Sequence, residues 1–403
     1  MQQLTRQTDQ CVKCGMCLPH CPTYRLTRQE GHSPRGRIAL VQALISGSVR
    51  PDQAQSYLQG CVACRSCEQV CPSNVPFADL MDSARMQFYP VTSKSSWIVR
   101  KVLRLLSSPE AQRFWYRLLW LGGMFGVLAL IRTLPYPGKR RVRRMIDMLP
   151  DIRYPAGWSR PNTGRLANAS DVSLFAGCTG ATLGQGSLQA AARCLAKLGY
   201  RVSLIENPAC CGLAARHAGD QTGAEQLQEQ MLNFLEGSHG TIVSMVSACS
   251  LSLQELARKQ GSADQARIMD LGAFLLKHRD TLPERPAFAK GSSLHVVLHR
   301  PCSARFCGDD SWSKIIKALP GIEVREIGQT GCCGAGGVQF LTDHPFSDTL
   351  ADNLVDQIEP ACSILLTHNM GCELHLRARL RLAGRRIKVM HPVELLDKYM
   401  SEH

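Results

Sequence analysis

Two cysteine runs with one common spacing constrain this chain more than any other feature of its sequence. Both follow the pattern Cys-x2-Cys-x2-Cys-x3-Cys-Pro, and the second begins 50 positions after the first. The runs are Cys11, Cys14, Cys17 and Cys21 with Pro22, and Cys61, Cys64, Cys67 and Cys71 with Pro72. An x2 spacing lets three thiolates from one tight loop reach one metal centre, so the pattern predicts two metal sites.

The spacing and the terminal Cys-Pro are those of bacterial two-cluster ferredoxins, in which the fourth cysteine of each run ligates the other cluster. Carried over to this sequence, the rule gives cluster one Cys11, Cys14, Cys17 and Cys71, and cluster two Cys61, Cys64, Cys67 and Cys21. Zinc is the alternative, because it also accepts four thiolates. Zinc motifs rarely repeat such a run, so we predict two [4Fe–4S] clusters, with iron held by these cysteines.

Helical patterns accompany the two runs. Residues 35–47 and 76–88 have the spacing of amphipathic helices, and the first of them ends at Gly47. We therefore predict a mostly α-helical, two-cluster ferredoxin-type domain over residues 1–90.

Composition limits the class of protein. Of the 403 residues, 44% are hydrophobic and 20% are charged, which is typical of a globular chain rather than a disordered or multi-span membrane protein. The polar start MQQLTRQTDQ has no apolar signal sequence, so we expect the 19 cysteines to lie in a reducing cytosol and to serve metal or redox chemistry. The net charge of +14 predicts an anionic partner such as membrane lipid, nucleic acid or an acidic subunit.

A second repeat occupies the rest of the chain. Its landmarks recur at offsets of 124, 122, 122 and 123 positions, which indicates an internal duplication. The first copy has Cys178, Cys210, Cys211 with Gly212, and Cys249, and the second has Cys302, Cys332, Cys333 with Gly334, and Cys372.

Each copy has the pattern of an α/β domain. Strands are predicted at 171–177, 201–206 and 241–247, and at 294–299, 322–327 and 363–368, with helices such as 186–199 between them. Alternating strands and helices predict a parallel sheet, whose ligands gather beyond the carboxyl ends of its strands. We expect domains at 166–285 and 286–403, with the landmark cysteines as candidate cluster ligands. A redox disulfide within Cys-Cys-Gly is the alternative, and Cys194, Cys307 and Cys362 are interpreted as buried structural cysteines.

Together, the two runs, the segment Pro34-Arg35-Gly36-Arg37 and the duplicated repeat resemble the glycolate oxidase iron–sulfur subunit family. The repeats are similar to the cysteine-rich "CCG" domains of that family and of heterodisulfide reductase. The resemblance covers nearly the whole chain except about residues 91–165. It implies an electron-transfer subunit of an oxidoreductase complex, which works beside FAD-containing subunits that oxidise glycolate or D-lactate and passes electrons toward membrane quinone.

The repeats depart from the family pattern at one point. The full pattern ends in Cys-x2-Cys, whereas each copy here keeps one cysteine, Cys249 or Cys372. This puts a noncubane, disulfide-reducing site in doubt and leaves open one ordinary cluster per copy or only one occupied copy. We predict no catalytic residue in the chain, because it has no flavin or nicotinamide fingerprint. A heterodisulfide reductase-like thiol–disulfide oxidoreductase and a scaffold with structural clusters remain the alternatives.

Residues 91–165 form a connecting segment, expected to be helical, basic and apolar. Its apolar run, 118–131, has 14 residues and is too short to span a bilayer, which needs about 20. Basic residues flank the run, most densely at 139–144. Residues 97–144 are therefore expected to lie on the cytoplasmic face of the inner membrane or to pack as a buried or subunit-docking helix. No nucleic-acid fold accompanies the basic run, so nucleic acid is not an expected partner.

A few polar residues near the cysteines have two interpretations. His217 and His375 are either cluster ligands or proton donors, or they are satisfied polar residues near helix starts. Arg35 and Arg37 either tune the potential of a cluster or form ordinary salt bridges.

Overall fold

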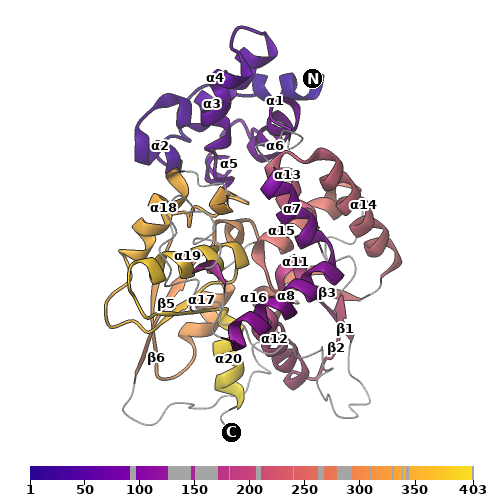
Figure 1. Ribbon diagram of the computed structural model, residues 1–403, viewed down its shortest axis with the longest axis vertical. Helices are drawn as coiled ribbons and strands as arrows, with labels where there is room; N and C mark the ends of the chain where they lie inside the picture. Colours follow the sequence, from indigo (N-terminus) through magenta and orange to yellow (C-terminus); the bar gives the residue numbers. More distant parts are fainter. Residues whose placement is uncertain are drawn as a thin grey trace. The chain divides into compact units, whose positions relative to one another are not determined.

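The computed structural model describes most of the chain: 1–90, 97–125, 147–149, 171–180, 182–205, 210–238, 240–261, 267–278, 293–307, 310–328, 331–337, 339–341 and 345–401. The chain divides into two compact units (Figure 1). Unit 1 is Met1–Leu103, Gly212–Gln226 and Thr330–Leu354, and unit 2 is Arg104–Cys211, Leu227–Gln329 and Val355–His403.

The N-terminal part of unit 1 is built from short helices around the two cysteine runs. They are α1 (Gln2–Asp9), α2 (Pro22–Thr27), the 3-10 turn η1 (Glu30–His32), α3 (Pro34–Ile45), α4 (Pro51–Gln59), α5 (Ser66–Gln69) and α6 (Phe77–Phe88). Proline is the first residue of α2, α3 and α4, where its missing N–H costs nothing. The predicted helices at 35–47 and 76–88 are thus confirmed with slightly shorter bounds.

An apolar core holds these helices together. It includes Val41 of α3, Leu58 of α4 and Leu80 of α6, all fully buried, and Cys61 and Cys67 of the second run belong to the same cluster. The cysteine loops are therefore anchored to a packed helical core. Unit 1 also contains α13 (Leu213–Ala218), the 3-10 turn η6 (Gln339–Leu341) and nearly all of α18 (Pro345–Val355), contributed by the two repeats.

Unit 2 contains two four-stranded sheets, and every strand pairing in them is parallel. One sheet has the order β2-β1-β3-β4 and the other β6-β5-β7-β8, so the two copies share one topology. The first has β1 (Asp171–Phe175), β2 (Arg201–Ile205), β3 (Thr241–Ser244) and β4 (Ile268–Asp270). The second has β5 (Leu294–His299), β6 (Ile322–Ile327), β7 (Ile364–Leu366) and β8 (Lys388–Met390).

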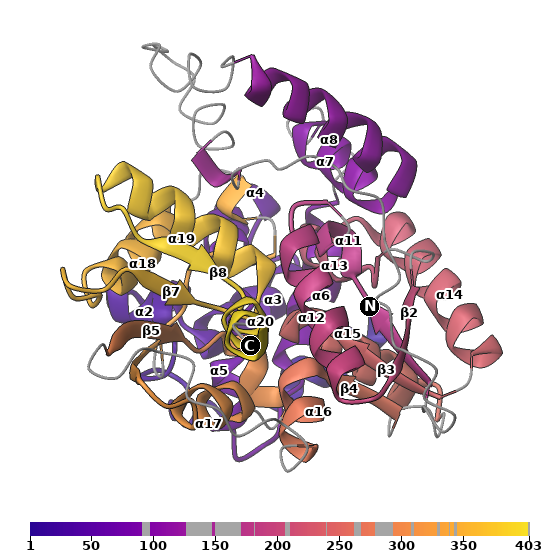
Figure 2. The same cartoon turned by 90° about the horizontal axis from the view of Figure 1, so that it is seen from below.

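Helices of the two repeats meet between the sheets of unit 2 (Figure 2). There α12 (Gln185–Lys197) packs on α20 (Pro392–Ser401), and α16 (Leu271–Lys277) packs on α17 (Ser311–Lys317). The remaining helices and turns are α7 (Trp97–Ser107), α8 (Pro109–Met124), α11 (Gly177–Gly180), α14 (Gln221–Gly237), α15 (Ser247–Lys259), η5 (Cys302–Phe306) and α19 (Met370–Leu382). Arg193 of α12 donates to the Asp397 carboxylate of α20 from Nη2 at 2.6 Å and from Nε at 3.0 and 3.2 Å, which ties the copies together.

The structure confirms the predicted class, a helical ferredoxin-type region followed by duplicated parallel α/β domains. The six predicted strands are present, and β4 and β8 are two further strands that were not predicted, because each short strand leads almost directly into an apolar helix, α16 or α20. The expected connecting segment falls largely outside the described residues, including the second half of the apolar run and the basic residues 139–144. None of the described helices has the length and hydropathy needed to cross a membrane.

Candidate metal centres

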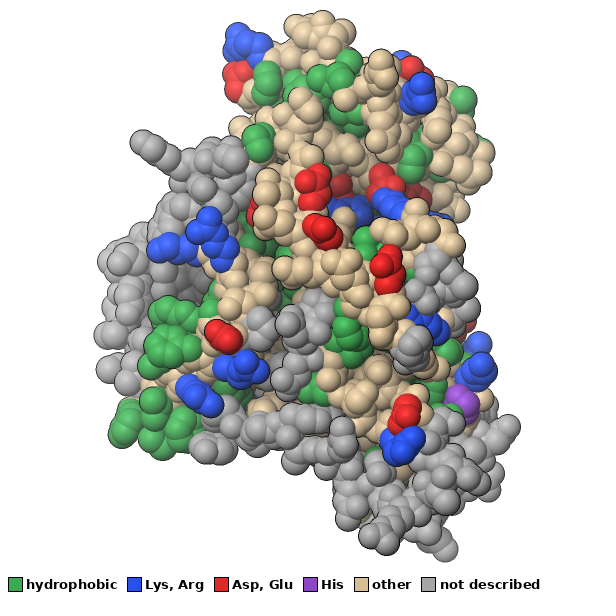
Figure 3. Space-filling view, turned by 90° about the vertical axis from the view of Figure 1, so that its right-hand side faces the viewer, with side chains coloured by type: hydrophobic (Ala, Val, Ile, Leu, Met, Phe, Trp, Pro, Cys, Tyr) green, Lys and Arg blue, Asp and Glu red, His purple; other side chains and the backbone are tan. Residues whose placement is uncertain are grey.

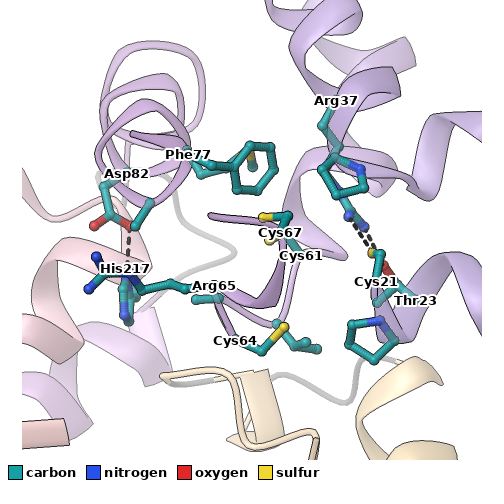
Figure 4. A pocket seen from close by; sticks show the side chains of 16 residues that line it. Cys21, Thr23, Arg37, Cys61, Cys64, Arg65, Cys67, Phe77, Asp82 and His217 are labelled. Carbon is teal, nitrogen blue, oxygen red and sulfur yellow. Dashed lines mark hydrogen bonds and ion pairs between the residues drawn. The ribbon is translucent and has the colours of Figure 1, made fainter. Parts of the chain in front are cut away.

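Four cysteines predicted for cluster two line one cavity in unit 1 (Figure 4). Cys21 is the N-cap of α2, Cys61 and Cys64 lie on the loop after α4, and Cys67 lies in α5. Cys21, Cys61 and Cys67 are less than 9% exposed. Burial and the neighbouring Cys64 and Cys61 thiols raise the pKa of Cys67 well above its ordinary value. Binding of metal cations is the ordinary way for such crowded thiols to become thiolates.

The cysteines predicted for cluster one line a second cavity in the same unit. Its walls include Cys11, Cys14, Cys17 and Cys71, together with Cys67 and Pro34. Pro34 also lines the cavity of the cluster-two cysteines, so the start of α3 borders both cavities. Burial raises the pKa of the Cys17 thiol above its ordinary value. The structure thus brings together each set of four cysteines assigned from the ferredoxin rule.

The two cysteine loops have the same backbone conformation. Lys13 and Gly15 in the first loop and Ala63 and Arg65 in the second have positive φ values of 56°, 84°, 49° and 60°. Three of these four are not glycine, and a left-handed non-glycine residue costs of order 1 kcal/mol. Such strain at matching positions of both runs indicates loops shaped around a ligand.

The donor set fits a multi-atom cluster better than a single ion. Nowhere in the described part of the chain do three or more His, Cys, Asp or Glu side chains converge as ligands of one metal ion would. The thiols of each set instead surround a cavity. None of the 19 cysteines, all of which lie in the described ranges, forms a disulfide.

Cys21 has a polar and cationic environment. Its Sγ lies 3.2 Å from the Thr23 Oγ1, and Arg37 Nη1 points at it from 3.9 Å (Figure 4). The second nitrogen of the guanidinium, Nη2, donates to Thr23 Oγ1 at 3.0 Å. The Arg37 side chain therefore lies against the wall of the cavity that cluster two is predicted to fill.

Of the two roles predicted for Arg35, tuning a cluster or forming a salt bridge, the structure shows a salt bridge. It donates to Glu30 Oε1 at 2.6 Å and to the carbonyl oxygen of Lys13 at 3.1 Å. The hydrogen bond from Arg35 lowers the pKa of the Glu30 carboxyl. Arg35 thus forms an ordinary surface salt bridge that also braces the first cysteine loop.

His217 lines the cavity of the cluster-two cysteines and is hydrogen-bonded there (Figure 4). Its Nδ1 lies 2.8 Å from Asp82 Oδ1, and Arg216 Nη2 donates to Asp82 Oδ2 at 2.8 Å. Burial by itself raises the pKa of Asp82, but His217, Arg216 and Arg85 outweigh it and hold that pKa well below its usual range. The network joins α13 to α6, and no sequence signal singled out Asp82 or Arg85.

The first-copy cysteines come together within unit 2. Cys249, in the first turn of α15, hydrogen-bonds Cys211, and this bond together with burial raises the pKa of Cys249 well above its ordinary value. Cys178 and Cys210 are close enough to contribute to the same rise. Cys178 follows β1 and Cys249 follows β3, and strand order reverses between these two strands, where ligands of open parallel sheets bind.

The second-copy cysteines occupy equivalent positions of their sheet and loop. Cys302 follows β5 and Cys372 lies in α19 after β7, at the matching reversal of strand order in unit 2. In unit 1, Cys332 forms a buried apolar cluster with Val62 and Leu350, and Cys64 of the second cysteine loop packs against this cluster.

The glycine that follows each vicinal pair is required by the backbone. Gly212 and Gly334 have φ values of 76° and 72°, in the left-handed region. A Cβ on Gly334 would lie 2.2 Å from the Ser347 carbonyl oxygen, so this position also has no room for a side chain.

The three remaining cysteines have no role in these groups. Cys194 is fully buried in α12, and burial raises its pKa far above the ordinary range. Cys362 is buried, whereas Cys307 is half-buried and lies 3.7 Å from the Ser247 carbonyl oxygen. His375 is fully buried in α19.

Comparison with known proteins places these sites in context. Residues 7–75 match the 4Fe-4S dicluster domain, and residues 172–254 and 296–377 match the cysteine-rich domain CCG. No solved structure matches the chain.

Curated relatives align over almost the whole chain. The chain is 25% identical to the probable glycolate oxidase iron-sulfur subunit of Bacillus subtilis, over 96% of this chain and 92% of the relative. It is 26% identical to the glycolate oxidase iron-sulfur subunit of Escherichia coli, over 97% and 94%. It is 23% identical to a fumarate reductase (CoM/CoB) subunit of Methanothermobacter marburgensis, over 99% and 74%. The chain is therefore an iron–sulfur, electron-transfer component of an oxidoreductase complex, homologous to glycolate oxidase iron–sulfur subunits and built from a [4Fe–4S] dicluster domain and two CCG domains.

Proposed function

We propose that this chain carries electrons from an FAD-containing subunit, which oxidises the 2-hydroxyacid glycolate or D-lactate, toward membrane quinone. The observation that carries the proposal is the pair of adjacent cavities, each lined by one predicted set of four cysteines. A [4Fe–4S] cluster supplies one-electron transfer without breaking a bond to its ligands. The protein residues hold the clusters, exclude water from them and set their electrostatic surroundings.

The ligand assignment follows the ferredoxin rule. Cluster one is proposed to bind Cys11, Cys14, Cys17 and Cys71, and cluster two Cys61, Cys64, Cys67 and Cys21. Cys67 and Pro34 border both cavities, so the two sets of cysteines would hold their clusters in neighbouring sites. The eight CCG-domain cysteines are proposed as ligands of one or two further clusters: Cys178, Cys210, Cys211, Cys249, Cys302, Cys332, Cys333 and Cys372.

Anaerobic co-purification with untagged partners, followed by iron counting and EPR on one sample, tests the proposal. We expect a flavoprotein to co-purify and the complex to contain at least about eight iron atoms per chain, rising to about twelve or sixteen if one or both repeats are filled. The purified chain alone should not reduce dye with glycolate or D-lactate. Substrate oxidation by the isolated chain would contradict the assignment of that chemistry to a partner.

We also propose that α8 contacts the cytoplasmic face of the inner membrane. Phe114, Leu118, Leu121 and Phe125 recur at helical spacing and are all exposed, by 59%, 42%, 39% and 74%. Arg113 and Arg117 are exposed on the same helix. Figure 3 shows hydrophobic side chains gathered at its lower left with Lys and Arg side chains beside them. An apolar helix face with adjacent cations suits an anionic leaflet.

Vesicle flotation tests the membrane contact. The chain should float with vesicles containing anionic phosphatidylglycerol, and the double change Phe114→Ser and Leu118→Ser should reduce the bound fraction several-fold. Leu382→Ser is the control, because Leu382 is 45% exposed on α19, away from this face in sequence. Equal flotation of the double variant and the control would assign the α8 face to a protein partner instead.

A thiol–disulfide oxidoreductase is the second candidate, and the hydrogen bond between Cys211 and Cys249 favours it, because two adjacent thiols can form a disulfide. Disulfide reduction with a low-potential electron donor measures this activity. Activity that disappears in Cys211→Ser or in its second-copy counterpart Cys333→Ser, while the ferredoxin-type clusters remain intact by EPR, would promote this candidate over the electron-transfer role.

A further inference from the structure

Arg37 is a charged side chain in the interior of unit 1. It lies in the first turn of α3 and is 1% exposed, which places it among the largest fully buried side chains of the described structure. A guanidinium keeps its charge in any protein environment. Taking an ion out of water costs several kcal/mol unless an opposite charge and hydrogen bonds compensate. The surroundings of Arg37 should therefore contain its compensation.

The hydrogen-bond partners of Arg37 are nearly all neutral. Its Nε donates to the Tyr57 carbonyl oxygen at 2.8 Å, and its Nη2 donates to Thr23 Oγ1 at 3.0 Å. The remaining donor, Nη1, points at Cys21 Sγ from 3.9 Å. Thr23 Oγ1 in turn donates to the His32 carbonyl oxygen at 2.9 Å, which leaves its lone pairs for Arg37. Within the described ranges, no carboxylate pairs with this guanidinium.

The other charged groups along this cavity are balanced by partners. Arg65 pairs with Glu68 at 2.7 Å, and Asp82 is surrounded by Arg216, His217 and Arg85. At the second cavity, Arg35 pairs with Glu30 and its side chain is 32% exposed, so water and the carboxylate both screen its charge. Arg85 is also buried and donates to the carbonyl oxygens of Leu58 and Cys61, but it lies close enough to the Asp82 carboxylate to lower the pKa of that group. Arg37 differs from these arginines because its burial is combined with neutral partners and with no carboxylate in reach within the described ranges.

An anionic cluster held by Cys21 supplies the missing counter-charge. Four thiolates outweigh the charge of the iron–sulfide core, so a ferredoxin-type centre is negative, and each added electron makes it more negative. A fixed cation in a region of low dielectric stabilises the reduced form more than the oxidised form, and thereby raises the reduction potential. The amino end of α3 borders both cavities, and there the Arg35 backbone hydrogen-bonds Cys17 of the cluster-one set. The full charge of Arg37 lies against Cys21 of the cluster-two set instead.

We propose that Arg37 is the counter-charge of cluster two and keeps the reduction potential of cluster two above that of cluster one. The inference depends on the ligand assignment proposed above, specifically on Cys21 as a ligand of cluster two. Its consequence is directional: an electron that reaches this pair of clusters settles on cluster two, beside which Cys332 of the second CCG copy is buried in unit 1.

Redox titration of the full chain, purified anaerobically with its clusters and followed by EPR, tests the inference. Arg37→Gln removes the charge but keeps hydrogen-bonding capacity, and Arg37→Lys keeps the charge. Arg50→Gln is the matched control, because Arg50 is an exposed arginine of the same domain that pairs with Asp52. We expect Arg37→Gln to shift one midpoint downward and leave the other in place. Arg37→Lys and Arg50→Gln should leave both midpoints close to those of the unaltered chain.

Iron content separates this inference from the ligand assignment. Loss of cluster two in Cys21→Ser tests the ligand, whereas midpoints of fully loaded Arg37 variants test the charge. Unchanged midpoints in fully loaded Arg37→Gln, or an equal shift of both clusters, would overturn the inference. If Arg37→Gln loses iron, the result with Arg37→Lys decides the question. An Arg37→Lys chain with full iron and unaltered midpoints supports the charge role, whereas loss of iron from this variant as well overturns the inference.

Discussion

At the scale of single residues, the segment Pro34-Arg35-Gly36-Arg37 illustrates how neighbours in sequence acquire separate tasks. Pro34 begins α3, Arg35 pairs with Glu30 at the surface, and Arg37 is buried against Cys21. A Cβ on Gly36 would lie 1.9 Å from the Glu30 carbonyl oxygen, so only glycine fits between them. From sequence alone Arg35 and Arg37 have the same two interpretations, and the difference in their burial separates them.

Asp82 is predicted to stabilise unit 1 through its buried charge. Asp82→Asn should lower the free energy of unfolding by about 3 kcal/mol, because His217 loses its buried counter-ion and Arg216 keeps only the more exposed Asp79. Urea unfolding under anaerobic conditions measures the loss. Since the pKa of Asp82 is held below its ordinary value, this stabilisation is present above about pH 4 and disappears as the pH falls further. The control Asp52→Asn, in an exposed pair, should change nothing measurable.

Protonation of His391 is predicted to lower the free energy of unfolding in acid. Its Nδ1 accepts from the Val393 N–H at 3.1 Å and its Nε2–H donates to the Met245 carbonyl oxygen at 2.9 Å, so the ring is held neutral. Burial lowers the pKa of His391 to about 3, and that of His299 also to about 3. Because both values lie below the unfolded value of 6.5, this stability is complete above pH 6.5 and is lost as the pH falls toward 3.

The pH dependence of the urea midpoint between pH 7 and 5 measures this effect. Each buried histidine should contribute a slope of about 1.4 kcal/mol per pH unit below pH 6.5. His391→Gln should remove its share of the slope. His295→Gln, at a residue whose side chain is 55% exposed, should leave the slope intact, and an unchanged slope in His391→Gln would show that this ring is protonated in the folded state.

At the scale of elements, the strands predicted from sequence are present, and landmark cysteines lie directly after them in the chain. Polar or turn residues bound the six predicted strands, whereas β4 and β8 lead almost directly into the apolar helices α16 and α20, so no break in the sequence pattern marks them as strands. The landmark cysteines were expected just after strands, and Cys178, Cys249 and Cys372 indeed lie in the first turn of the helices that follow. Strand order, which places them where it reverses, required the sheet pairing.

The contact between α16 and α17 is predicted to depend on the absence of a side chain at Gly272. A Cβ on Gly272 would lie 2.7 Å from Trp312 Nε1, and Trp312 is 1% exposed and cannot move aside. Gly272→Ala should therefore lower the free energy of unfolding by about 1–3 kcal/mol, measured by the urea midpoint. Gly237→Ala is the control, because no atom lies within 4 Å of its added Cβ at the end of α14. Equal midpoints for the two variants would show that the helices separate at no cost.

At the scale of the whole molecule, the two ferredoxin-type sites differ in their access to solvent. Cys14 is exposed and Cys11, Cys17 and Cys71 are half-buried, whereas three of the four cysteines at the other cavity are buried. This difference arises from the helical core, which covers the second cysteine loop more completely than the first.

Iron removal is therefore predicted to proceed in two phases. An anaerobic chelator should extract cluster one first and cluster two several-fold more slowly, because attack requires access to the ligands. The time course of chelated iron, with EPR of the remaining cluster, measures both rates. Cys14→Ser should accelerate or abolish the fast phase and leave the slow phase in place. A single phase, or loss of the buried cluster first, would contradict the predicted order.

The sequence by itself determined the donor chemistry: two ferredoxin-type cysteine runs, a duplicated cysteine-rich α/β domain and no motif for substrate oxidation. Spacing carries this information because ligand geometry and helix and strand periods are local. The tertiary structure alone decided which charges are buried and which groups meet. Arg37 beside Cys21, Asp82 beside His217, and Cys332 in one apolar cluster with Val62 join residues 16, 135 and 270 positions apart. Burial and dielectric surroundings are properties of the packed chain, so no local pattern predicts them.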